Sequence, residues 1–251
     1  MSSSANGLFA RIVALLFACV SLAACGDTGL PRFDLPLSGA GTAERTFTDG
    51  DWSVTLTRAD VAFGPAYFCA TTAADVDLCP VALAEFTGAA VVDALDDLPQ
   101  ELGALTVDAG TVRSATYDFG LTWLVTAQEP EPQTSALGGH SARFRGVAER
   151  ADDQFEFALD IDVTSANAGD IAVRGAQTMQ RLPGTTTGLM VRMDPAAWWQ
   201  GVDYDGLFLE AQAEPGSVVR VDPSSPSAGV VRQGMTSRNA PTFEWSDDSR
   251  P

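Results

Sequence analysis

Apolar and polar residues alternate along three segments of the chain. Residues 117–125 and 155–163 carry large apolar side chains at every second position, and residues 52–57 repeat the pattern on a smaller scale. The apolar positions are Trp52, Val54, Leu56, Tyr117, Phe119, Leu121, Trp123, Val125, Phe155, Phe157, Leu159, Ile161 and Val163. Successive side chains of a β-strand point to opposite faces, so this alternation predicts strands with one buried face.

Weaker patterns of the same kind fill much of the chain between residues 81 and 221. We predict further strands at 81–92, 105–114, 141–149, 171–181, 186–193, 206–213 and 217–221, with turn-forming sequences between several of them. Many short strands with few long helical patterns predict an all-β fold. The expected architecture is an antiparallel β-sandwich of about 8–10 strands with one or two short helices.

Two segments favour a short helix. One covers about 94–102, where Pro99 limits it to a turn or two. The other begins at Asp194, an N-cap residue followed by a proline, and continues into Trp198 and Trp199.

The patterns place the β-sandwich domain at residues 46–221. Glycine, proline and serine with little periodicity predict a flexible tether over residues 25–45. Residues 222–251 are interpreted as a Pro/Ser-rich C-terminal tail, in which Phe243 and Trp245 predict a last edge strand near 242–245.

The N-terminus carries an export signal. An apolar run follows Arg11 and ends at Leu22-Ala23-Ala24-Cys25. A positive start, an apolar middle and a small-residue end are typical of a secretory signal peptide, here residues 1–24. The alternative is an uncleaved transmembrane helix over residues 8–24, at the short edge of the length that spans a bilayer.

The sequence Leu22–Cys25 resembles the lipobox of bacterial lipoproteins. In that family the cysteine carries acyl chains and becomes the first residue of the mature protein, so the resemblance implies that Cys25 is lipidated and anchors the chain to a membrane. Gly26 follows, rather than the aspartate that commonly retains such proteins in the inner membrane, and Asp27 comes one position later. In a Gram-negative host, the resemblance therefore favours the outer membrane. It covers about the first 27 residues, and beyond the signal we recognise no domain family.

Charge and cysteine usage narrow the function. The chain has 33 acidic and 15 basic residues, and removal of residues 1–24 changes the net charge from −18 to −19. Nucleic-acid binding needs a basic patch, which the sequence lacks. Cys19 lies in the signal and Cys25 carries the lipid, so Cys69 and Cys79 predict one disulfide in an exported protein. A metal site at this pair is the alternative, although its spacing is not typical of zinc.

His140 is the single histidine, and it precedes Ser141. A catalytic triad needs the imidazole to face the serine oxygen, whereas neighbours on a strand point to opposite sides. The nucleophile-elbow motif fails because Arg143 stands where its last glycine should be. With no catalytic motif left, the sequence predicts a non-enzymatic protein.

Candidate binding residues fall between 190 and 206. Asp203 and Asp205, before a glycine, suit Ca²⁺, with a solvated acidic turn as the alternative. Met190 and Met193 suit Cu(I), but we interpret them as core residues. Trp198 and Trp199 are interpreted as an exposed aromatic turn that would anchor a protein or glycan partner.

The leading hypothesis is a lipid-anchored cell-envelope protein with a binding or scaffolding role. One alternative is a calcium- or copper-binding exported lipoprotein, which metal analysis of the purified protein would identify. Another is a carboxylate-dependent hydrolase, which requires a concave pocket holding two acids with well-separated pKa values.

Overall fold

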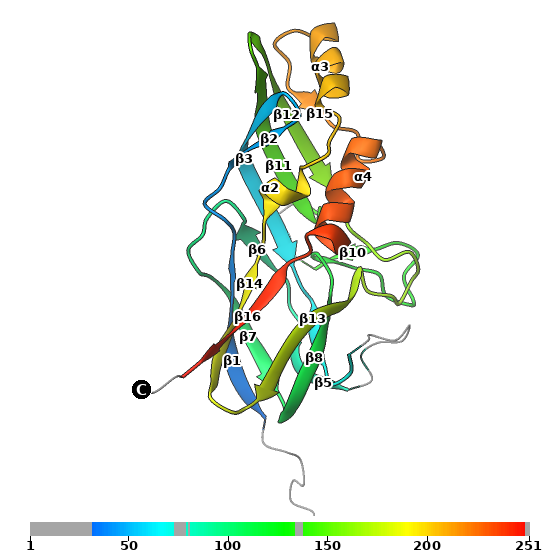
Figure 1. Ribbon diagram of the computed structural model, residues 1–251. Helices are drawn as coiled ribbons and strands as arrows, with labels where there is room; N and C mark the ends of the chain where they lie inside the picture. The colour runs from blue at the N-terminus through cyan, green and yellow to red at the C-terminus, as the bar shows by residue number, and fades with distance from the viewer. Residues whose placement is uncertain (1–31, 73–78, 80, 134–137, 249–251) are drawn as a thin grey trace, which may run out of the picture. The chain divides into compact units, whose positions relative to one another are not determined.

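Strands make up about half of the described residues. The computed structural model describes residues 32–72, 79, 81–133 and 138–248, all within one compact unit, Arg32–Pro251 (Figure 1). These residues form sixteen strands, arranged in two large sheets and one two-stranded pairing of β9 (Leu121–Thr122) with β10 (Glu131–Pro132). A continuous hydrophobic core runs through the unit. The predicted all-β fold with few short helices is confirmed.

The first sheet has eight strands in the order β13-β8-β4-β5-β7-β1-β14-β16. They are β1 (Phe33–Ala40), β4 (Ala66–Cys69), β5 (Ala82–Phe86), β7 (Gln100–Val107), β8 (Gly110–Tyr117), β13 (Val173–Leu182), β14 (Thr186–Arg192) and β16 (Thr242–Asp247). Its outer strands meet, because the Trp245 indole donates to Thr178 Oγ1 over 2.8 Å. Phe68 of β4 and Phe243 of β16 pack edge to face inside, with ring centroids 5.3 Å apart. The sheet therefore curls toward a barrel that side chains close.

The second sheet has the strand order β15-β12-β11-β3-β2, and β6 also pairs with β3. These strands are β2 (Thr46–Asp49), β3 (Trp52–Phe63), β6 (Ala90–Asp93), β11 (Ala142–Arg150), β12 (Asp153–Ile161) and β15 (Val219–Arg220). Apolar side chains at alternate positions of β3, β11 and β12 form one buried face.

Three short helices and one π-helical turn lie against this buried face. They are α2 (Pro195–Trp198), α3 (Tyr204–Ala213), α4 (Pro226–Gln233) and η1 (Gly234–Arg238). The ring of Phe208 on α3 lies 5.4 Å from Trp52 of β3, and Trp199 after α2 lies 4.7 Å from Phe157 of β12. Figure 1 shows the helices along one side of the second sheet. The sheet thus buries its apolar face under the C-terminal third of the chain.

Several predicted elements differ from the structure. Residues 206–213 belong to helix α3, not to a strand, and 94–102 contains a turn and the start of β7, not a helix. The run 117–125 is not one strand, since β8 ends at Tyr117 and Gly120 has a positive φ of 72°. The sheets are also mixed, because β1 pairs with β14 and β12 pairs with β15 in parallel.

The predicted domain limits of 46–221 were too narrow. Within the expected tether 25–45, β1 lies between β7 and β14 in the first sheet, and Leu37 is 1% exposed. Within the expected tail 222–251, α4 covers the second sheet. The edge strand near 242–245 is confirmed as β16. Both ends of the described chain are therefore parts of the fold.

Candidate functional site

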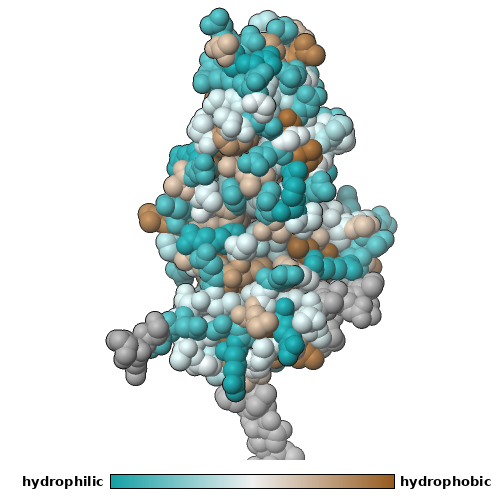
Figure 2. Space-filling model, viewed as in Figure 1, coloured by the Kyte–Doolittle hydropathy of each residue, from teal (hydrophilic) through white to brown (hydrophobic). Residues whose placement is uncertain are grey.

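A surface groove of about 500 Å³ lies between β12, α3 and the loop that leads to β15. Its lining residues are Gln154, Phe155, Glu156, Phe208, Ala211, Gln212, Pro215, Gly216, Ser217 and Val218. Val218 is 40% exposed, and Leu209 nearby on α3 is 66% exposed. In Figure 2, the end of the protein that carries α3 is largely hydrophilic with small apolar patches. This groove is the candidate binding site.

One arginine holds α3 against the sheet beside the groove. The Arg150 guanidinium at the end of β11 lies 4.2 Å from the ring centroid of Trp52, within cation–π range. Arg150 also pairs with Asp205 in the first turn of α3 over 2.5 Å. The Trp52 indole donates to the same carboxylate oxygen over 3.2 Å. The hydrogen bonds from Arg150 and Trp52 hold the pKa of Asp205 below its usual range.

We expect Asp205→Asn to lower the Tm by roughly 2 °C, because the ion pair that fixes the start of α3 is lost and such exposed pairs contribute little. A carboxylate with a depressed folded-state pKa stabilises the protein above its unfolded pKa and ceases to do so as the pH falls. The two melting curves should therefore converge in acid. Thermal melts at neutral and low pH measure this effect.

Asp203→Asn is the matched control, since it removes one carboxylate charge from the same turn. Asp203 is the N-cap of α3, and its Oδ1 accepts a hydrogen bond from the Gly206 amide over 2.9 Å. Asparagine caps helices as well as aspartate does. An equal loss of Tm in both variants would show that net charge matters and the Arg150 contact does not.

The predicted calcium ligands thus have other partners in the structure. Asp203 caps a helix, and Asp205 is paired with Arg150 and Trp52. In the described ranges, no cluster of three or more histidine, cysteine or acidic side chains could hold a metal ion. Of the proposed copper ligands, Met193 is 1% exposed and packs in the core, while Met190 lies partly buried on β14.

The prediction that Trp198 and Trp199 form an exposed binding turn was wrong, because both side chains have 0% exposure. Both rings contact Phe144 of the sheet, with ring centroids 6.2 Å away for Trp198 and 5.6 Å away for Trp199. Trp199 packs against Phe144 and Phe157 of the sheet, whereas the Trp198 indole donates to the Asn239 carbonyl behind η1 over 2.7 Å. The predicted helix start is confirmed, since Asp194 accepts from the Ala197 amide over 3.1 Å. The pair is core, and it anchors α2 between sheet and helices.

His140 and Ser141 have separate partners. The His140 Nδ1 lies 2.9 Å from Asp162 Oδ1 at the surface. The Ser141 hydroxyl is fully buried and accepts from the Val163 amide over 3.0 Å. The structure therefore does not bring the imidazole and the hydroxyl together.

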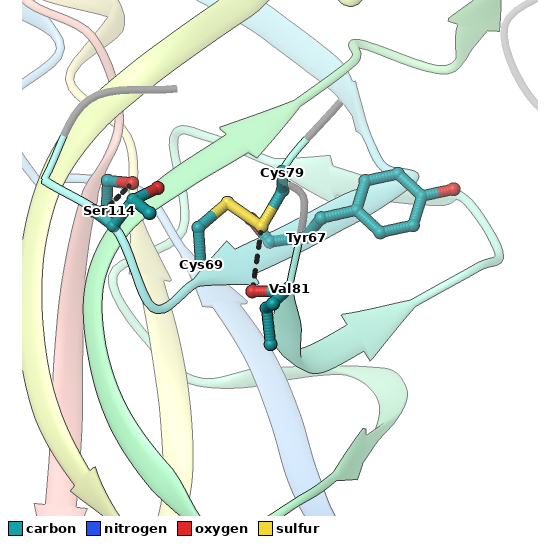
Figure 3. The surroundings of a disulfide bond; sticks show 6 residues. Tyr67, Cys69, Cys79, Val81 and Ser114 are labelled. Atoms are coloured by element: carbon teal, nitrogen blue, oxygen red, sulfur yellow. Dashed lines mark hydrogen bonds between the residues drawn. A yellow bond between two sulfur atoms is a disulfide. The ribbon is translucent and has the colours of Figure 1, made fainter. Parts of the chain in front are cut away.

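The predicted disulfide between Cys69 and Cys79 is present, and this excludes the alternative of a metal site at the pair. The two Cα atoms are 5.5 Å apart. Figure 3 shows the bridge joining the end of β4 to the segment before β5, with Cys79 Sγ 3.3 Å from the Val81 carbonyl oxygen. Cys25 lies outside the described residues, so its lipidation stays a prediction.

Sequence analysis missed a buried carboxylate. Asp118, directly after β8, is 2% exposed, and in the described part of the chain it forms no ion pair. It accepts hydrogen bonds from the Ala172 amide over 2.8 Å and from the Thr122 hydroxyl over 3.3 Å. Burial raises the pKa of Asp118 to about 6, although these hydrogen bonds oppose the rise. Asp118 does not line the groove beside α3.

Comparison with known proteins gives no relative. No protein-family model, no curated protein and no solved structure matches the chain. Among the helices that the structure describes, none is long and apolar enough to cross a membrane.

Proposed function

We propose that this chain is an exported bacterial lipoprotein whose β-domain binds or scaffolds a partner at the cell envelope without performing chemistry. The sequence Leu22–Cys25, at the end of an apolar run, carries the proposal. The Cys69–Cys79 disulfide supports it, because structural disulfides persist mainly in oxidising compartments. Gly26 after the cysteine favours the outer membrane in a Gram-negative host.

The length of chain after Cys25 limits where the domain would lie. Since β1 begins at Phe33, residues 26–32 separate the anchor from the fold. Seven fully extended residues span at most about 25 Å. A lipidated Cys25 would therefore keep the start of β1 near the membrane. Figure 1 shows α3 and β15 at the opposite end of the domain from the start of β1.

We expect Cys25→Ser to abolish lipid labelling and to release the protein from the membrane fraction, because serine has no thiol to acylate. Growth with labelled palmitate followed by membrane fractionation measures both effects. Cys19→Ser is the matched control, since that cysteine lies in the predicted signal and should leave labelling unchanged.

Retention of label by the Cys25→Ser variant would contradict the lipoprotein proposal. Membrane retention without any label in the wild type would instead support an uncleaved transmembrane helix over residues 8–24. Sucrose-gradient separation of inner and outer membranes then decides the location of the labelled protein.

A further inference from the structure

The outer edge of β12 is only partly covered. β15 pairs with β12 at Phe157 and Ala158 and nowhere else. The Val221 amide donates to the Ala158 carbonyl over 2.9 Å, so the backbone groups of Ala158 point away from β11. Backbone groups alternate in direction along a strand. Those of Gln154 and the amide of Glu156 therefore also point outward, where no described strand pairs with them, whereas the Glu156 carbonyl faces the Val219 amide of β15.

This open edge forms one wall of the groove, and α3 forms the other. Gln154, Phe155 and Glu156 are consecutive lining residues, as expected where a strand edge and not a sheet face borders a groove. Phe208 and Ala211 of α3 and Val218 before β15 also line the groove. A volume of about 500 Å³ is within the range of ligand sites. A strand edge facing a helix, with apolar side chains between them, suits an added strand.

The charges around the edge of β12 favour a positively charged ligand. Glu156 is exposed, and the ten residues that line the groove include no arginine. Glu210 and Glu214 line a neighbouring groove that shares Ser217 and Val218 with this one, and Arg220 lines it too. A second copy of this chain, with a net charge of −18, would be repelled. A cationic segment would be attracted.

We propose that the groove between β12 and α3 binds an extended, cationic segment of a partner protein. The segment adds as a strand beside Gln154–Glu156, places an apolar side chain against Phe208 and Val218, and sets a lysine or arginine next to Glu156. Main-chain hydrogen bonds supply affinity and the alternate side-chain positions supply specificity. The inference rests on the proposed binding role and names the surface and the class of partner.

The test uses the detergent-solubilised full chain and a labelled seven-residue peptide in which valine alternates with arginine. Fluorescence anisotropy measures its Kd, and residue-resolved amide exchange measures protection. We expect saturable binding that slows exchange at Gln154 and Glu156. The amides of Phe155 and Phe157 point toward β11, so their exchange should stay unchanged. A peptide N-methylated at every residue should not bind, because neither of its edges can donate to β12.

Two substitutions locate the contact. Glu156→Arg should raise the Kd for the arginine peptide about tenfold, because attraction becomes repulsion. Glu101→Arg, an equal charge change at an exposed position of β7, is the control and should leave the Kd unchanged. Gln154→Pro removes one outward amide at an edge position that tolerates proline, and it should weaken binding while circular dichroism confirms the fold.

Three results would each overturn the inference: no binding at about 1 mM peptide, equal binding of the N-methylated peptide, or equal effects of Glu156→Arg and Glu101→Arg. Concentration-dependent dimerisation that protects the same amides would show that a second copy occupies the edge, and this would also overturn it. Each result leaves palmitate labelling at Cys25 unaffected, so the failure of the groove and the failure of the lipoprotein proposal can be distinguished.

Discussion

Trp199→Ala is expected to lower the free energy of unfolding by about 3–5 kcal/mol, the usual cost of removing a large buried aromatic side chain. Trp199 has 0% exposure, and its ring lies 4.7 Å from that of Phe157 and 5.6 Å from that of Phe144. Its removal leaves a cavity between the second sheet and α2. Urea unfolding followed by circular dichroism measures the loss as a lower midpoint at unchanged slope.

Trp199→Phe separates packing from the indole nitrogen. The buried Nε1 of Trp199 has no hydrogen-bond partner among the described residues, so phenylalanine removes an unsatisfied donor while filling most of the space. We expect it to cost much less than alanine. Leu98→Ala, at a side chain that is 65% exposed, is the control and should change stability by less than about 0.5 kcal/mol. If Trp199→Ala were as stable as the wild type, the result would contradict burial of Trp199 and would support the exposed binding turn.

The burial of both tryptophans shows why local patterns could not place them. Neighbouring residues of a helix point in different directions, so one of two adjacent aromatics is normally expected at the surface. Here α2 has a partner on each side. Both rings pack against Phe144 of the sheet, Trp199 also packs against Phe157, and the Trp198 indole donates to the Asn239 carbonyl behind η1. Sequence gives the helix start at Asp194, but it cannot show that two layers enclose the helix.

Helix α3 was missed for a related reason. Leu207, Leu209 and Ala211 lie at alternate positions, which is the pattern of a strand. The N-cap bond that Asp203 accepts from the Gly206 amide and the Arg150 contact with Asp205 stabilise the helix instead. In the helix, Leu209 is left exposed. The N-cap and the tertiary contacts therefore outweighed the alternation of apolar residues in the sequence.

The strands with the largest alternating side chains were the easiest to predict. The run 155–163 overlaps β12 up to Ile161, because one face of that strand packs in the core and the other faces outward. The groove could not be foreseen from the same pattern. It exists because β15 has only two residues and leaves the β12 edge open at Gln154–Glu156. The alternation of apolar residues in β12 carries no information about the length of β15, which comes some sixty residues later in the chain.

Asp118 illustrates the same limit for a charged residue. Between Tyr117 and Phe119, its place in an alternating run predicts the polar, solvated side of a strand. The strand ends instead, and the Ala172 amide and the Thr122 hydroxyl enclose the carboxylate. The sequence signal is a single acid within an apolar run, which also describes ordinary surface positions of a sheet.

Stability should fall as the pH rises through the titration of Asp118. Its pKa is raised by burial from 3.8 to about 6 in the folded protein. The folded state therefore binds this proton more tightly than the unfolded state. The contribution of the group is fully present below about pH 4 and is lost as the pH rises through about 6. A shift of this size corresponds to about 3 kcal/mol, at 1.36 kcal/mol per pKa unit.

Asp118→Asn should remove this dependence without disturbing the local structure. The asparagine oxygen can still accept from the Ala172 amide, and its NH₂ group can donate to the Thr122 hydroxyl, which both donates and accepts. Because asparagine does not ionise, the variant should gain stability relative to the wild type between about pH 4 and 6. Urea midpoints of both proteins across pH 3.5–7.5 measure the difference, which cancels the titration of all other groups.

The direction of that difference identifies its cause. An Asp118 stabilised by an undetected cation would have a lowered pKa, and the variant would then lose stability as the pH rises. If the stability difference between variant and wild type did not depend on pH, solvent would reach the carboxylate. The difference would then report only the contacts that the side chain makes in the loop. A rise centred near pH 5–6 is expected only where a carboxylate is held in a site that favours its neutral form. In that case the junction of β8 with the start of β13 is tightest in acid and loosens toward neutrality.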